Sequence, residues 1–266
     1  MAAACGDHAG HCVHQRALRD DREADLNGDG TPDLAVTNNS SNTVSVLLNM
    51  TATGSTTPSF AAKVDFTIGA NPYSVAIGDL DGNGTPDLAV ANANSNTVSV
   101  FLNTTATGST TPSFAAKVDF TTGGGPISIA IADLDGDGTP DLAVANEASN
   151  TVSALLNTTA TGSTTPSFAA KVDFTTGAAP FSVAIADLDG DGTPDLAVAN
   201  RVSNTVSVLV NTTATGSTNP SFAAKVDFTT GGGPFSVAIA DLNGDGKPDL
   251  GVANVNSNTV SVLLAR

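Results

Sequence analysis

The strongest constraint on the fold is an acidic loop of nine residues that the chain repeats five times at a spacing of 54 residues. The copies begin at Asp25, Asp79, Asp133, Asp187 and Asp241. Each copy has oxygen-bearing side chains at positions 1, 3, 5 and 9 and glycine at positions 4 and 6. A hard divalent cation takes about six to eight oxygen ligands, and carboxylates on alternate residues of a tight turn supply them. The sequence therefore predicts up to five bound calcium ions.

Each predicted site combines four side chains with the main-chain carbonyl at position 7. In the third copy, glycine at Gly138 lets the backbone turn sharply enough for the carbonyl of Thr139 to face the ion. The predicted ligands are Asp25, Asn27, Asp29, Thr31 and Asp33; Asp79, Asp81, Asn83, Thr85 and Asp87; Asp133, Asp135, Asp137, Thr139 and Asp141; Asp187, Asp189, Asp191, Thr193 and Asp195; and Asp241, Asn243, Asp245, Lys247 and Asp249. Since position 7 gives only its carbonyl, Lys247 is expected to point outward and to weaken its site slightly.

The overall charge is consistent with metal binding. The formal net charge is −16, and 17 of the 26 acidic residues lie in the five loops. Five divalent cations would bring the net charge to about −6. Only ten Lys and Arg are present, with no repeated basic stripe, so no nucleic-acid partner is expected.

Two other interpretations of the loops are weaker. A helix–loop–helix calcium site needs glutamate at position 12, where this chain has Val36, Val90, Val144, Val198 and Val252. Asp, Asn and Gly also make ordinary hairpin turns, but such turns do not need three or four carboxylates.

The rest of each repeat reads as short strands. In the fourth copy, 180–186, 195–200, 205–211 and 222–228 are β-branched or apolar runs separated by turn residues. Four short strands in 54 residues are typical of one propeller blade, and strands apolar on both faces fit stacked blades. The fold class predicted is all-β, a β-propeller of about five four-stranded blades, with the possibility of an incomplete seven-bladed ring left open. The strands count as three, four, four, four and three.

The expected domains are an irregular, disordered head at 1–24 and the repeats at 25–266. The head contains Cys5, His8, His11, Cys12 and His14, which could ligate zinc, although no pair has finger spacing. It lacks the apolar stretch of a signal peptide, so a truncated start is one explanation, and no apolar run is long enough to span a membrane.

With its flanking residues, the chain resembles the FG-GAP/VCBS repeat family, known from the propeller head of integrin α subunits. The segment from Phe228 through Gly-Gly-Gly-Pro234 to the loop Asp241–Asp249 shows the phenylalanine–glycine, glycine–x–proline and acidic-loop order. The resemblance implies that each loop joins the first two strands of a blade and binds calcium.

Function is expected to be non-catalytic. The repeats contain no histidine or cysteine, so Ser-His-Asp and Cys-His chemistry are excluded there. The repeated lysines Lys63, Lys117, Lys171 and Lys225 are expected at the surface or at strand edges. We expect an extracellular or cell-surface binding or adhesion module. The alternatives are a carbohydrate-binding, lectin-like propeller, although no Trp and only Tyr73 are present, or the substrate-recognition part of a larger secreted enzyme.

The copies differ mainly in one turn, and this variation indicates where a partner binds. The variable pairs are Asn39-Ser40, Ala93-Asn94, Glu147-Ala148, Arg201-Val202 and Val255-Asn256. The link before each first strand also varies, as in Ala70-Asn71 against Gly124-Gly125. Strand alternation places both turns on the rim opposite the acidic loops, where a protein or glycan ligand is expected. Neutral drift at exposed turns would give the same variation.

Overall fold

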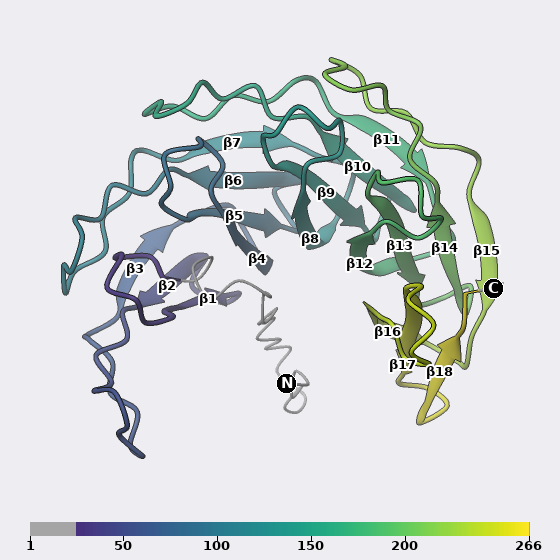
Figure 1. Ribbon diagram of the computed structural model, residues 1–266, viewed down its shortest axis with the longest axis horizontal. Coiled ribbons are helices and arrows are strands. Elements are labelled where there is room, and N and C mark those ends of the chain that lie inside the picture. The colour runs from purple at the N-terminus through teal and green to yellow at the C-terminus, as the bar shows by residue number, and fades with distance from the viewer. Residues whose placement is uncertain (1–24, 266) are drawn as a thin grey trace. The chain divides into compact units, whose positions relative to one another are not determined.

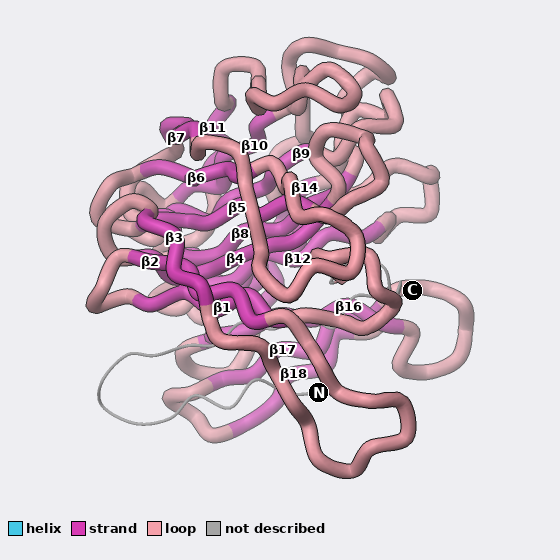
Figure 2. Tube along the Cα trace, turned by 90° about the vertical axis from the view of Figure 1, so that its left-hand side faces the viewer, coloured by secondary structure: helices cyan, strands magenta, loops and turns pink. Residues whose placement is uncertain are grey.

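The computed structural model describes residues 25–265, which form strands and loops and no helix (Figure 1, Figure 2). That range accordingly holds no helix able to cross a bilayer. The predicted head, with its candidate zinc ligands, lies outside the described residues. Two compact units divide the described chain: one comprises residues 25–121 and Thr158–Ser167, the other Thr122–Asn157 and 168–265.

Every repeat forms one antiparallel sheet whose strands follow one another in chain order. The first unit contains the sheet β1 (Leu34–Asn38), β2 (Thr43–Leu47), β3 (Val64–Thr67) and the sheet β4 (Pro72–Gly78), β5 (Asp87–Asn92), β6 (Thr97–Phe101), β7 (Val118–Thr121). The second unit contains the sheets β8 (Pro126–Ala132), β9 (Asp141–Asn146), β10 (Thr151–Leu155), β11 (Val172–Thr175); β12 (Pro180–Ala186), β13 (Asp195–Asn200), β14 (Thr205–Leu209), β15 (Val226–Thr229); and β16 (Pro234–Ala240), β17 (Asp249–Asn254), β18 (Thr259–Leu263).

The predicted fold class is confirmed as all-β with propeller-type blades, and the strand count of three, four, four, four and three is also confirmed. Two boundaries differ. The third strand of the fourth copy ends at Leu209, whereas the run from Thr205 was predicted to continue to Asn211. The fourth strand of the fourth copy begins at Val226, whereas the apolar run starts at Phe222. Phe222 pairs only through an isolated bridge with Asn211, so the Ala-Ala-Lys between them lies outside the ladder.

Strand register separates the acidic loops from the variable turns. In the fourth copy, Ala186 lies opposite Asp195 at the end of β12 and β13 that carries the acidic loop. Pro180 lies opposite Asn200 at the other end. There the amide of Arg201 donates to the carbonyl of Ala179, which joins the variable turn to the variable link. Both variable segments therefore lie at the end of the sheet opposite the acidic loop, as predicted.

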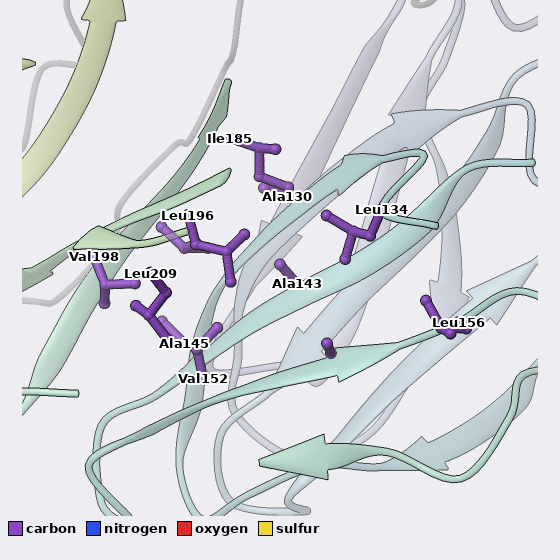
Figure 3. Packing of buried hydrophobic residues seen from close by; sticks show 12 residues of the cluster. Ala130, Leu134, Ala143, Ala145, Val152, Leu156, Ile185, Leu196, Val198 and Leu209 are labelled. Atoms are coloured by element: carbon purple, nitrogen blue, oxygen red, sulfur yellow. The ribbon is translucent and has the colours of Figure 1, made fainter. Parts of the chain in front are cut away.

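Alanine and branched residues alternate in the core because both faces of a sheet are covered. In the second unit, Ala143 and Ala145 of β9 and Val152 of β10 pack with Val198 and Leu209 of the next sheet (Figure 3). All of these side chains are nearly fully buried. Small side chains on one face allow close approach of the larger ones on the facing sheet, which holds each acidic loop on a rigid support.

Candidate metal centre

Each acidic loop is folded by its own side chains. In the third loop, Asp133 accepts the amides of Asp137 at 3.1 Å and Gly138 at 2.9 Å. Asp137 in turn accepts the amide of Thr139 at 2.7 Å. Gly136 and Gly138 have φ of 69° and 92°, a left-handed backbone that favours glycine. The alternation of Asp and Gly is therefore required for the turn itself, in which the position-5 carboxylate of Asp137 bonds to Thr139.

The aspartate at position 9 anchors the loop to the sheet. One carboxylate oxygen of Asp87 accepts the amide of Leu80 at 2.8 Å, and the other accepts the amide of Asn103 at 2.7 Å. Asp87 opens β5 and is fully buried. The same two bonds recur in the other four copies, at Asp33, Asp141, Asp195 and Asp249. Sequence reasoning treated this residue only as a ligand and did not predict its second role.

Three loops bring a carboxylate triad together. In each triad one oxygen from positions 1, 3 and 9 lies within 4.8 Å of the others. The triads are Asp79, Asp81 and Asp87; Asp133, Asp135 and Asp141; and Asp187, Asp189 and Asp195. The first and fifth loops have asparagine at position 3, so positions 1, 3 and 9 hold two carboxylates there instead of three, with the same arrangement of hydrogen bonds. Lys247 is exposed in the fifth loop, as expected. An all-oxygen set of this kind suits a hard divalent ion.

The following repeat covers three of the five loops. The amide of Gly108 donates to the carbonyl of Asn27 at 2.7 Å, and Gly162 donates in the same way to Asp81 at 2.8 Å and Gly216 to Asp135 at 2.9 Å. We call the segments around these glycines (residues 104–111, 158–165 and 212–219), which connect the third and fourth strands, the covering loops. Each lies in the same unit as the loop that it covers.

The side chain at position 3 of an acidic loop is buried where a covering loop is present and exposed where none is described. Asn27, Asp81 and Asp135 are 2%, 3% and 5% exposed, whereas Asp189 and Asn243, which have no covering loop in the described residues, are exposed. The covering loops looked like featureless Thr/Ser/Gly stretches in the sequence. Their near-identical repetition in four copies is the signal that could have indicated a role.

Burial changes the protonation of the anchoring aspartates. Desolvation raises the pKa of Asp87 and of Asp141 to about 7, and that of Asp33 to about 6, against the favourable effect of the two backbone donors. Burial also raises the pKa of Asp81, Asp135 and Asp195. By contrast, the hydroxyl of Thr31 lowers the pKa of the exposed Asp29. A bound divalent cation would reverse the upward shifts by compensating the buried charge.

The metal-free protein is therefore expected to become less stable as the pH rises from 5.5 to 8. An unfolded aspartate loses its proton near pH 3.8, but folded Asp87 and Asp141 keep theirs to about pH 7. The folded state binds more protons in this window, and the associated stability is lost as the pH passes the folded pKa. The loss should be about 2 kcal/mol from each group, measured by urea denaturation in chelator. The Asp87→Asn variant should lose less stability over the same pH range. A chelated protein that is more stable at pH 8 than at pH 5.5 would contradict the raised pKa of these aspartates.

A second polar cluster holds the outer strand in place in four of the five described sheets. The hydroxyl of Ser99 donates to Asp119 at 2.6 Å, and Lys117 forms an ion pair with the other carboxylate oxygen. Asn92 donates to the same hydroxyl at 2.9 Å. The repeated lysines thus lie directly before the edge strands, and each is paired with the aspartate two residues later. This pairing occurs in four copies, at Lys63, Lys117, Lys171 and Lys225.

Four repeated asparagines that stand in Asn-x-Thr sequences, Asn49, Asn103, Asn157 and Asn211, have a structural role. Asn103 is 5% exposed, and its side-chain amide donates to the carbonyls of Leu26 and Pro86, both at 2.8 Å. Asn211 makes the equivalent bonds to Leu134 and Pro194. These asparagines join one acidic loop to the next, and their burial makes them poor acceptors for a glycan.

Solved structures support the fold. Two crystal structures of BBS1N in complex with ARL6DN, one soaked with mercury and one with lead, are 13% identical to this chain, with TM-scores of 0.53 and 0.52. The matches cover 96% and 90% of this chain and 68% and 66% of those chains, so this chain spans about two thirds of their length. The crystal structure of the V. cholerae biofilm matrix protein Bap1 matches with 16% identity and a TM-score of 0.45 over 98% of this chain and 40% of that chain. At such identities the two BBS1N structures show the fold alone.

The family is assigned from the match of the sequence to a family profile. No curated protein matches it significantly. The family profile described as FG-GAP-like repeat matches residues 25–90, 84–144, 133–198 and 187–252, which together span most of the chain. Three of the four matches begin on the first residue of an acidic loop. The chain therefore belongs to the FG-GAP-like repeat family.

Proposed function

We propose that this protein is a non-catalytic, calcium-stabilised binding or adhesion module that works on or outside the cell. The carboxylate triads, each with oxygens within 4.8 Å of one another, are the observation that carries the proposal. Three or four carboxylates in one loop repel one another strongly without a cation: two charges 4 Å apart repel by about 4 kcal/mol at a dielectric constant near 20. A cation is therefore expected to be part of the folded loop.

Calcium fits these loops better than other common ions. The repeats offer carboxylates, amide oxygens and backbone carbonyls, while every histidine and cysteine of the chain belongs to residues 1–24. Zinc and copper prefer nitrogen and sulfur ligands, and magnesium demands a near-ideal octahedron with several waters. Short acidic loops of this kind bind calcium best where it is near millimolar, which supports a location outside the cytosol.

The end of each sheet opposite the acidic loops is the proposed ligand surface. Its turns differ between copies, and backbone hydrogen bonds hold them rigidly, as between the amide of Glu147 and the carbonyl of Gly125 at 2.8 Å. Exposed variable side chains on a rigid backbone are a typical recognition surface. This surface includes the exposed Ala148. It also includes the guanidinium of Arg201, which stacks over Phe181 with its central carbon 5.4 Å from the ring centre.

The double variant Glu147→Ala/Ala148→Asn is expected to reduce ligand binding without changing the melting temperature. It copies the Ala93-Asn94 turn of the second copy, so the backbone is compatible with the change. Labelled protein in calcium buffer should be screened on a glycan array and on an array of extracellular proteins, and each hit remeasured with the variant. Glycan hits alone would favour the lectin-like alternative. If neither array gives a hit that calcium chelation abolishes, a binding module is the wrong description.

A further inference from the structure

The second acidic loop differs from the third and fourth by a single side chain. Position 5 is Asn83 in this loop and aspartate in the other four copies. Changing that one amide to a carboxylate would give Asp-Leu-Asp-Gly-Asp-Gly-Thr-Pro-Asp, the sequence of the third and fourth loops. Asn83 also stands directly before Gly84. An asparagine before glycine can lose its side-chain amide without an enzyme, because the next backbone nitrogen is not crowded by a side chain and can attack the amide carbon.

The nitrogen that would attack is already hydrogen-bonded to a base. The backbone amide of Gly84 donates its hydrogen to a carboxylate oxygen of Asp79 at 2.8 Å. Asp79 is therefore placed to take the proton that this nitrogen loses during the attack, which is general base catalysis. The space around Gly84 is open, since a Cβ at this residue would meet no atom within 4 Å beyond its chain neighbours. Asn83 is exposed, so water reaches the site.

The carbonyl that would be attacked is bonded to two donors. The oxygen Oδ1 of Asn83 accepts the backbone amide of Thr85 at 2.7 Å and also accepts the hydroxyl of Thr85. Negative charge develops on this oxygen when a nucleophile adds to the carbonyl. Both donors then bond more strongly to the transition state than to the starting amide, as in an oxyanion hole. The loop thus holds a nucleophile, a base and an oxyanion site around one amide.

The other two asparagines of the acidic loops also precede glycine but have a different arrangement. Asn27 and Asn243 stand at position 3, so the residue two places later is an aspartate, which offers a backbone amide but no hydroxyl. Asn27 is also only 2% exposed, and its side-chain amide donates to the carbonyl of Ser109 in a covering loop at 2.9 Å. The chain therefore contains a protected Asn-Gly pair to compare with Asn83.

We propose that Asn83 is a self-modifying site, at which the loop converts its own asparagine to aspartate. The nitrogen of Gly84 bonds to Cγ of Asn83 and passes its proton to Asp79, and the side-chain nitrogen leaves with that proton as ammonia. Water then adds to Cγ of the cyclic imide and breaks the bond from Cγ to the nitrogen of Gly84, which restores the ordinary main chain. One water is consumed, one ammonia is released, and nothing is oxidised or reduced. The second loop then carries four carboxylates, as the third and fourth loops do.

The test is to incubate the whole folded protein at mildly alkaline pH and to follow position 83 by peptide mass spectrometry. Chelator is present, because a cation bound by Asp79 would compete with Gly84 for that carboxylate. A protease that cuts before aspartate, but not before asparagine or isoaspartate, identifies the product. We expect aspartate to accumulate at position 83 while Asn27 stays an amide. An amide that persists at position 83, or isoaspartate as the sole product, would overturn the proposal.

Three variants make the test specific. Thr85→Val removes the hydroxyl donor and Asp79→Asn removes the base, so each should slow the conversion about tenfold or more. Asp137→Asn transfers the site, because it gives the third loop the sequence of the second, and Asp133 already accepts the amide of the following glycine there at 2.9 Å. Position 137 should then convert as fast as Asn83. Unchanged rates in the first two variants, or an inert transferred site, would show that the loop does not assist the reaction and would overturn the proposal.

Discussion

Removing calcium is expected to lower the melting temperature by about 10 °C. At a tenfold excess of calcium over its dissociation constant, each site adds about 1.4 kcal/mol of stability. The three covered loops would together add about 4 kcal/mol, and each kilocalorie moves the melting point of a domain of this size by about 2–4 °C. The two uncovered loops should add less, because position 3 is exposed there.

Calorimetry with calcium, with magnesium and with chelator measures the effect. Calcium should restore the transition after chelation, whereas magnesium should restore it poorly, because the loops do not provide a rigid octahedron. The first unit contains two covered loops and the second contains one. The first is thus expected to lose more stability. Superimposable curves under the three conditions would show that the loops are ordinary turns.

The Asp87→Ala variant is expected to lose about 3 kcal/mol of stability even in chelator. Its carboxylate is fully buried and accepts the amides of Leu80 and Asn103, which would both be left unsatisfied. Each buried unsatisfied group costs about 1–3 kcal/mol. The variant should also lose its response to calcium at this loop.

Two further variants separate the structural role from the metal-binding role. Asp87→Asn keeps an acceptor for one amide but carries no charge, so it should lose most of the calcium response and less of the intrinsic stability. Asp191→Ala removes a carboxylate from an exposed position whose bonds come from Thr193. It should affect calcium binding with little change in chelator. If urea denaturation shows equal losses for Asp87→Ala and Asp191→Ala in chelator, the anchoring role is wrong.

The sequence alone predicted the features that depend on residues close together in the chain. The bounds of β12 and β13 follow from Pro180, from the acidic loop and from the asparagine at Asn200, because each of these interrupts a strand within a few residues. The acidic loops were equally visible, since their spacing alone places the oxygens of one turn together. The fold class followed from the number of such strands in each repeat.

Other features depend on contacts that no local pattern contains. The bond between Gly108 and Asn27 joins two consecutive copies through residues that are distant within the chain, so sequence spacing could not reveal it. The anchoring of Asp87 by the amide of Asn103 depends on which strands become neighbours. The pairing of Ser99 with Asp119 depends on the register between β6 and β7. Each of these follows from tertiary arrangement and was missed for that reason.

The covering loops give the repeat array a direction. Gly108, Gly162 and Gly216 each close the acidic loop of the copy before their own, never that of the copy after. A copy added after an uncovered acidic loop would therefore bring a covering loop for it, together with a new acidic loop that has no covering loop. Adding a copy would bury the acidic loop of the copy before it and strengthen its metal site, whereas deleting a copy would expose that acidic loop. Evolutionary growth and loss of repeats in such an array should consequently be unequal at its two ends.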